Sequence, residues 1–141
     1  MSTFVSTVAV KWVEGTLMTG ADSRGKTIVI GNQGDGSVEM VGVKPSDLLL
    51  LAAASCSTYD IVTILAKQKE PVEKFDVVCT GEQMKVPPNQ FTKIHLHYIV
   101  KGKVNAEKLS RAIHLSEEKY CSVLATLRDL VITSSDFEII A

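Results

Sequence analysis

The long apolar segment Leu48–Ala66 constrains the fold more than any other feature of this chain. Pro45 suits the first turn of a helix, and Ser46 or Asp47 can accept hydrogen bonds from the free backbone N–H groups there. We therefore predict a helix over residues 45–69. Its N-terminal half is apolar on every side, so we expect the folded protein to enclose this helix.

The same segment is long enough to raise the question of a membrane span. It contains Asp60, Ser55, Ser57 and Thr58, which favour a buried helix over a membrane helix. The N-terminus has neither a basic segment nor an apolar signal core. The three cysteines have no regular spacing, which argues against a secreted disulfide scaffold. We predict a soluble cytoplasmic protein with reduced thiols and no membrane partner.

The rest of the chain has an order of strand and helix patterns that is typical of an α+β fold. A chain of 141 residues suits one domain, so we assign residues 1–141 to a single domain. It would comprise an N-terminal strand meander (1–43), the long helix (45–69) and a C-terminal unit (72–141). We expect strands at 4–12, 27–30, 75–81, 91–100 and 137–140, and helices at 105–120 and 121–127.

Several classes of function are disfavoured. The net charge is −1 and no dense Lys/Arg patch occurs, so we expect no nucleic-acid partner. The chain has no phosphate-binding loop and no nucleophile elbow. His95 and His97 share one strand face, but two ligands are too few for a metal site, and we interpret this as a solvated face beside Lys93 and Lys101. His114 is expected on a helix surface. We expect neither a metal nor a cofactor.

Two cysteines have settings that permit chemistry. A thiol inside a helix is usually inert packing, but Cys56 has Asp60 one turn later, and a buried carboxylate needs a partner. Asp47 and Asp60 together suggest a polar pocket in an apolar helix. Cys121 either packs inertly or lies at a helix start, where backbone N–H groups lower the pKa of a thiol. Cys79, in a strand, is interpreted as structural. If the fold brings Cys56 and Cys121 together, they form a thiol–disulfide redox pair.

Two segments together resemble the OsmC/Ohr superfamily, and its YhfA-like branch in particular. Residues 44–57, Lys-Pro-Ser-Asp-Leu-Leu-Leu-Leu-Ala-Ala-Ala-Ser-Cys-Ser, resemble the first-cysteine helix of that family. Residues 94–102, followed by 115–123 with Tyr-Cys-Ser-Val at their end, resemble its second half. The resemblance implies an OsmC-like fold, with antiparallel sheets packed around a long central Cys-bearing helix. It also implies an intertwined homodimer.

The resemblance implies a site and an activity as well. The best-known members are thiol peroxidases that act on organic hydroperoxides. In that pattern Cys56 attacks the peroxide and becomes a sulfenic acid, and Cys121 then closes a disulfide that an external dithiol reduces. Those peroxidases support the reactive thiolate with an N-terminal arginine and a glutamate near the start of the Cys helix. This chain offers Arg24 and the shorter, displaced Asp47, and it has Ser122 where the peroxidases commonly have proline.

We therefore expect a two-cysteine hydroperoxide reductase in oxidative-stress defence. The incomplete Arg/Glu pair leaves one alternative open, a non-catalytic dimer of the same fold whose apolar helix lines a small-ligand pocket. A second alternative is a thiol redox sensor, which would form the disulfide without turning over a dithiol.

Overall fold

The computed structural model describes residues 2–32 and 41–141. It divides into two compact units, Met1–Leu48 and Leu49–Ala141. The mixed α+β class and the two three-stranded sheets agree with the predicted OsmC-like fold. Whether the chain behaves as one domain stays a prediction.

The first unit contains an antiparallel sheet, as the sequence indicated. Its strands are β1 (Ala9–Glu14), β2 (Leu17–Ala21) and β3 (Thr27–Ile30), in that spatial order. The prediction of a strand from residue 4 was wrong for residues 4–8, because β1 pairs with β2 only from Ala9 onward. A β-rich pattern without a partner strand forms no ladder. The glycines of segment 31–36 also predict a loop there, but residues 33–36 lie outside the described part of the chain.

The second unit holds the long helix and the C-terminal elements. The elements are α1 (Asp47–Lys67), β4 (Lys74–Gln83), β5 (Phe91–Lys101), α2 (Ala106–Leu115), the π-helical turn η1 (Ser116–Tyr120), α3 (Ser122–Leu127) and β6 (Ile132–Ile140). The helix predicted at 45–69 is confirmed to within two residues at each end. The helix predicted at 105–120 is α-helical only as far as Leu115, and its last turn is η1.

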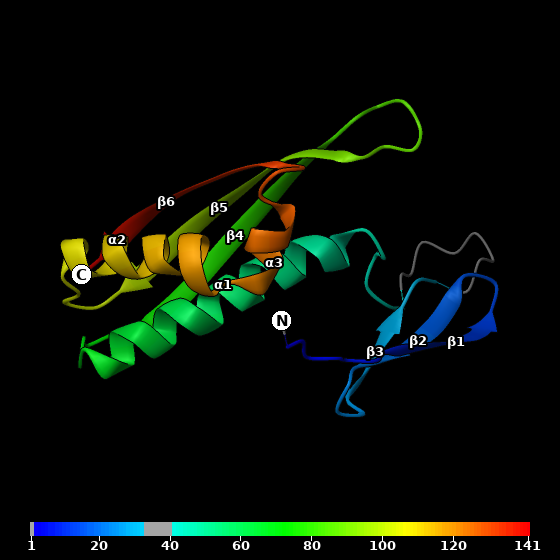
Figure 1. The fold of residues 1–141 in the computed structure, drawn as a ribbon, viewed down its shortest axis with the longest axis horizontal. Helices are drawn as coiled ribbons and strands as arrows, with labels where there is room; N and C mark the ends of the chain where they lie inside the picture. Colours follow the sequence, from blue (N-terminus) through cyan, green and yellow to red (C-terminus); the bar gives the residue numbers. More distant parts are fainter. Residues whose placement is uncertain (1, 33–40) are drawn as a thin grey trace. The chain divides into compact units, whose positions relative to one another are not determined.

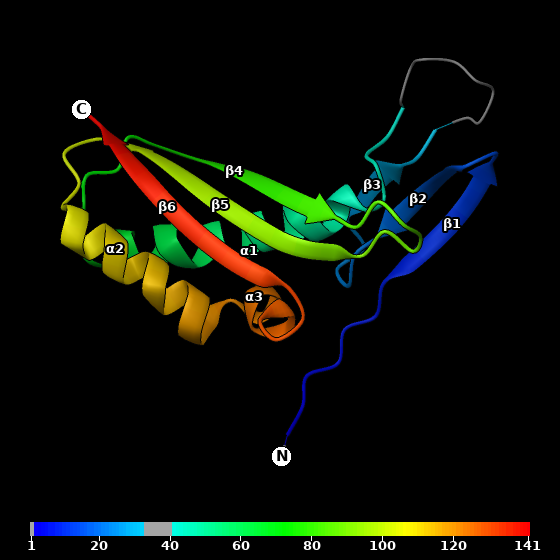
Figure 2. The same ribbon diagram turned by 90° about the horizontal axis from the view of Figure 1, so that it is seen from above.

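One strand pairing differs from the expected antiparallel sheets. The order is β4-β5-β6, and β4 runs antiparallel to β5, but β6 runs parallel to β5. Parallel neighbours require a crossover connection, and the segment from α2 to α3 supplies it along one face of the sheet (Figure 2). Because β6 pairs with β5 along the whole register from Ile132 to Ile140, it begins earlier than the predicted strand at 137–140.

The core of this unit lies between the sheet and the helices (Figure 1). The strand predicted at 91–100 is confirmed as β5, and its inward residues are buried against α1 and α2. The buried set on these elements comprises Ala53, Ala54, Ser57, Ile61, Leu65, Ile94, Leu96, Tyr98, Val100, Leu109, Ala112 and Ile113. The sheet and α2 thus both pack on one side of α1.

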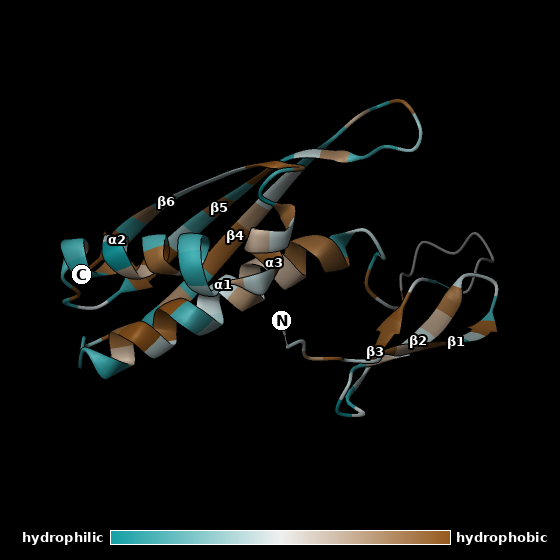
Figure 3. Cartoon of the chain, viewed as in Figure 1, coloured by the Kyte–Doolittle hydropathy of each residue, from teal (hydrophilic) through white to brown (hydrophobic). Residues whose placement is uncertain are grey.

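The other side of α1 is exposed in the single chain. Leu51 is 53% exposed and Tyr59 is 74% exposed, although the N-terminal turns of the helix are largely hydrophobic (Figure 3). Within one chain the neighbours of α1 cover only one of its faces, so the expected enclosure of the whole helix stays a prediction that requires a second copy. By length and composition alone α1 could cross a membrane, but here it carries one face of a protein core.

Candidate functional site

The fold brings the two singled-out cysteines together. Cys56 lies in the middle of α1, and Cys121 is the N-cap residue of α3. Their Sγ atoms and a carboxylate oxygen of Asp60 all lie within 4.8 Å of one another. Cys56 Sγ also lies 3.9 Å from Ser122 Oγ. We call Cys56, Cys121 and Asp60 the thiol site. Both thiols are free, Cys56 half-buried and Cys121 buried.

Cys121 has the predicted position but the opposite pKa shift. Its Sγ accepts a hydrogen bond from the backbone N–H of Leu124 at 3.4 Å, as expected for a cap. The side chain is only 1% exposed, and this burial raises the pKa of the Cys121 thiol to about 11. The neighbouring Cys56 also raises it, while the Leu124 N–H lowers it without compensating. Of the two predicted alternatives for Cys121, the lowered pKa was therefore wrong, because desolvation outweighs the backbone N–H groups of Leu124 and Val123.

The π-helical turn η1 sets the position of Cys121. The backbone N–H of Cys121 donates to the carbonyl oxygen of Ser116 at 2.8 Å, a bond that spans five residues. Arg128 holds the same turn, since its Nη2 donates to the carbonyl of Glu117 at 2.8 Å and to that of Glu118 at 3.3 Å. Such π-turns occur often at functional sites. Here the turn aims Cys121 back toward α1.

Asp60 has the partner that its semi-buried position requires. Ser116 Oγ donates to Asp60 Oδ2 at 3.0 Å and lies 3.2 Å from Ser57 Oγ. Ser57 Oγ in turn lies 2.5 Å from the hydroxyl of Tyr98. We call these three residues, Ser57, Ser116 and Tyr98, the hydroxyl chain, and all of them are buried. Burial raises the pKa of the Tyr98 hydroxyl. The hydroxyl chain was not predicted from the sequence, because Ser57 and Ser116 belong to no motif and meet only through helix packing.

Two hollows lie beside the thiol site. One, of about 240 Å³, includes Ser122 and is otherwise lined mainly by apolar side chains: Leu49, Ala52, Val123, Thr126 and Leu127. The other, of about 520 Å³, includes Asp60 in its wall together with Tyr59, Thr63, Ile64, Lys67, Gln68, Leu115 and Tyr120. The half-buried Cys56 is therefore close to space that a small molecule can enter.

The remaining predicted residues lie elsewhere. Arg24 is in an exposed turn of the first unit, where its backbone N–H donates to Asp22 Oδ1 at 2.9 Å. Asp47 is exposed in the first turn of α1. Cys79 packs on β4 against the core, and burial raises its thiol pKa, which suits a structural residue. A supporting role for Arg24 or Asp47 at Cys56 stays a prediction.

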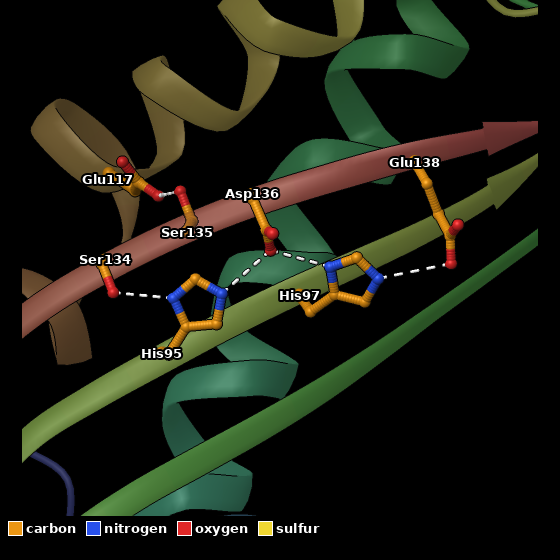
Figure 4. A network of polar contacts seen from close by, with 7 residues as sticks. All are labelled: His95, His97, Glu117, Ser134, Ser135, Asp136 and Glu138. Atoms are coloured by element: carbon orange, nitrogen blue, oxygen red, sulfur yellow. Dashed lines mark hydrogen bonds and ion pairs between the residues drawn. The ribbon is translucent and has the colours of Figure 1, made fainter.

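The strand face with His95 and His97 is a connected network rather than a row of separate solvated side chains (Figure 4). Asp136 Oδ1 lies 2.9 Å from Nε2 of His95 and 2.7 Å from Nδ1 of His97. Ser134 and Glu138 bond the other two ring nitrogens. The hydrogen bond that His97 donates to the Asp136 carboxylate raises the pKa of His97. The sequence missed the network because its acceptors come from β6, whose parallel pairing was not predicted.

Comparison with known proteins identifies the family. The family model described as OsmC-like protein matches residues 34–135. The protein YhfA of Escherichia coli K12 is 38% identical over 134 residues, which cover 94% of this chain and 96% of the relative. A crystal structure of a hypothetical protein from Aquifex aeolicus VF5 matches with a TM-score of 0.85 and 28% identity, covering 97% of both chains.

The organic hydroperoxide resistance protein OhrB of Bacillus subtilis has the same fold. It matches with a TM-score of 0.63 and 15% identity, covering 96% of this chain and 98% of that one. At 15% identity this match supports a shared fold and nothing about function. The family model and the 38% identical relative agree with the cysteine-bearing helix and the second-half motif, so the chain belongs to the OsmC-like protein family.

Proposed function

We propose that this protein is a thiol-dependent peroxidase that reduces organic hydroperoxides through Cys56 and Cys121. The observation that carries the proposal is the approach of the two Sγ atoms to within 4.8 Å across a helix packing interface. A disulfide needs an S–S distance of about 2.05 Å, so modest side-chain rotation and backbone adjustment must close the gap. The unequal burial of the two thiols supports different roles for them.

The half-buried Cys56 is the thiol that a peroxide can reach. Its thiolate attacks the distal oxygen of the hydroperoxide and breaks the O–O bond. The alkoxide leaves with a proton as the alcohol, and Cys56 becomes a sulfenic acid. This step reduces the peroxide by two electrons and oxidises the sulfur by the same number.

The buried Cys121 then resolves the sulfenic acid. Because burial raises its pKa to about 11, Cys121 rests as the thiol at neutral pH. Its sulfur attacks the Cys56 sulfur, and the thiol proton leaves with the hydroxide as water. An external dithiol restores both thiols by exchange, so the cycle needs no metal or organic cofactor.

The 240 Å³ hollow supports an organic substrate. Leu49 and Ala52 precede Cys56 on α1, and Ser122, which lies 3.9 Å from Cys56 Sγ, is part of the same wall. Such an apolar wall favours a hydrocarbon group over water. The proposal therefore places the alkyl part of the hydroperoxide in this hollow and its O–O bond at Cys56.

The proposal includes a homodimer that acts in the cytoplasm in oxidative-stress defence. The exposed apolar side chains of α1, Leu51 and Tyr59 among them, are the surface that a second copy would cover. We further propose that Arg24 and Asp47 assist ionisation of Cys56, as the family resemblance implies. Light scattering of the purified protein tests the dimer directly.

The deciding experiment treats the reduced protein with one equivalent of cumene hydroperoxide and maps disulfides by mass spectrometry. A rapid Cys56–Cys121 disulfide, absent in Cys56→Ser and retained in Cys79→Ser, supports the proposal. Turnover with a dithiol then separates the enzyme from a redox sensor, which forms the disulfide without turnover. Thiols that stay unreacted at high peroxide concentration would refute the proposed peroxidase activity.

One observation favours a second candidate. The 520 Å³ hollow beside Asp60 lies within the usual size range of small-ligand sites. A non-catalytic dimer that binds a small apolar ligand would use this space. Saturable binding of an apolar dye together with inert thiols would support that candidate.

A further inference from the structure

The thiol site contains the donor set of a soft-metal centre. Two cysteine sulfurs and one carboxylate oxygen lie within 4.8 Å of one another, from three residues on two elements. Cys56 and Asp60 are one helical turn apart on α1, and Cys121 caps α3 opposite them. Within residues 2–32 and 41–141, this is the one group of three such residues whose donor atoms gather so closely.

We propose that the reduced protein binds a thiophilic divalent cation of the zinc class through Cys56, Cys121 and Asp60. A tetrahedral zinc ion has Zn–S distances of about 2.3 Å and Zn–O distances of about 2.0–2.2 Å. Its ligands are then separated by roughly 3.5–3.8 Å, from the same bond lengths. Donor atoms that already lie within 4.8 Å need to shift by about 1 Å or less. Three protein ligands leave the fourth position to water.

The surrounding hydrogen bonds suit these ligands. Ser116 donates to Asp60 Oδ2 at 3.0 Å, which fixes the carboxylate and leaves further lone pairs on its oxygens to bind a metal. The Leu124 N–H donates to Cys121 Sγ at 3.4 Å and would stabilise a thiolate there. Ser122 lies beside Cys56 Sγ. Outer hydrogen bonds of this kind orient metal ligands and often change affinity by about 10–100-fold.

Metal binding is chemically opposed to disulfide formation. Both cysteines must be thiolates to coordinate the ion, so binding Zn²⁺ releases any proton that Cys56 and Cys121 still carry. The bound ion ties up the sulfur pair that would otherwise form the disulfide. Binding therefore protects both thiols from oxidation and alkylation, whether or not the protein is a peroxidase.

The test uses cobalt(II) as a coloured substitute for zinc. We expect the anaerobic, reduced protein to bind one Co²⁺ per chain, with a sulfur-to-cobalt charge-transfer band and the visible bands of a tetrahedral ion. Zn²⁺ should bleach these bands. Cys56→Ser, Cys121→Ser and Asp60→Asn should each weaken binding by at least tenfold, while Cys79→Ser, the matched cysteine control, should not. Absent bands, or bands that depend on Cys79, would overturn the proposal.

A second measurement needs no variant and so does not depend on how the variants fold. Reduced wild-type protein is alkylated with iodoacetamide with and without Zn²⁺, and each cysteine is quantified by mass spectrometry. We expect Zn²⁺ to slow modification of Cys56 and Cys121 at least tenfold and to leave Cys79 unchanged. Equal rates with and without Zn²⁺ at all three cysteines would refute the site.

The metal site and the peroxidase fail in distinguishable ways. A Cys56–Cys121 disulfide after peroxide, without cobalt bands, refutes the metal site and leaves the peroxidase standing. Cobalt bands in a protein whose thiols ignore peroxide support the metal site and refute the peroxidase. If both hold, excess Zn²⁺ should slow disulfide formation in proportion to the occupied fraction.

Discussion

Ser57→Ala should destabilise the protein more than Tyr98→Phe, although both changes break the same hydrogen bond. The bond joins Ser57 Oγ and the Tyr98 hydroxyl at 2.5 Å, and both side chains are buried. In Tyr98→Phe the remaining Ser57 hydroxyl keeps Ser116 as a partner at 3.2 Å. The cost is then that of one hydrogen bond, about 0.5–1.5 kcal/mol.

Ser57→Ala leaves the Tyr98 hydroxyl without its partner in the core. A buried hydroxyl without a partner costs about 1–3 kcal/mol, and the contact between Ser57 and Ser116 is lost as well. We therefore expect about 2 kcal/mol or more for Ser57→Ala against about 1 kcal/mol for Tyr98→Phe, from the same ranges. With a urea slope of about 1–3 kcal/mol per molar, these costs shift the midpoint by roughly 1 M and 0.5 M.

The assay is urea unfolding followed by circular dichroism, with all variants at one protein concentration because any dimer makes stability concentration-dependent. Ser55→Ala is the matched control on the exposed side of α1, and we expect it to change stability by less than about 0.5 kcal/mol. The double variant Ser57→Ala/Tyr98→Phe gives the interaction free energy of the pair, as the difference between its destabilisation and the sum of the two single destabilisations. If Tyr98→Phe proves as costly as Ser57→Ala, the assignment of the orphaned group is incorrect.

Three further predictions concern titration and ionisation. In Cys56→Ser, alkylation of Cys121 should keep accelerating above pH 9, because burial raises its pKa; a plateau near the free-thiol value of about 8.5 would contradict this. If Arg24 supports the Cys56 thiolate, Arg24→Ala should slow alkylation of Cys56 at neutral pH at least tenfold, and Arg24→Lys should recover part of the rate. Unchanged alkylation rates would exclude this role for Arg24. Asp136→Asn should lower the pKa of His97, measured by NMR titration, because the hydrogen bond that His97 donates to the Asp136 carboxylate raises this pKa. Because the pKa is raised, the contact between His97 and Asp136 stabilises the folded protein below about pH 6.5, and this stabilisation is lost as the pH rises through the folded-state pKa of His97. An unchanged titration of His97 in Asp136→Asn would refute the contact.

Local elements of this fold could be predicted because they depend on neighbouring residues. The apolar run and its Pro-Ser-Asp start indicated α1, and the observed helix spans Asp47–Lys67. The helix predicted from residue 105 has Asn105 as its N-cap residue, whose side chain accepts from the Lys108 N–H at 3.0 Å. The strand predicted at 91–100 is β5, and its buried residues alternate with exposed or half-buried ones. Two motifs far apart in the chain also resembled the OsmC/Ohr superfamily, and the family model that matches residues 34–135 confirms this.

Pairings between distant segments could not be predicted in the same way. The parallel pairing of β6 with β5, and with it the contacts of Asp136 to His95 and His97, follows from the path of the crossover helices. An unpaired stretch at residues 4–8 has the composition of a strand but lacks a partner in the described chain. Backbone pairing is a property of two segments, whereas propensity belongs to one.

The thiol site likewise depends partly on residue type and partly on contacts between distant segments. The residue types alone show which groups can react: two cysteines and a carboxylate one turn from the first. Helix packing brings these three together, places Ser116 against Asp60, and buries Cys121 so that its pKa is raised. Spacing along a chain places donors on one helix, but distance and desolvation between helices depend on how the core packs.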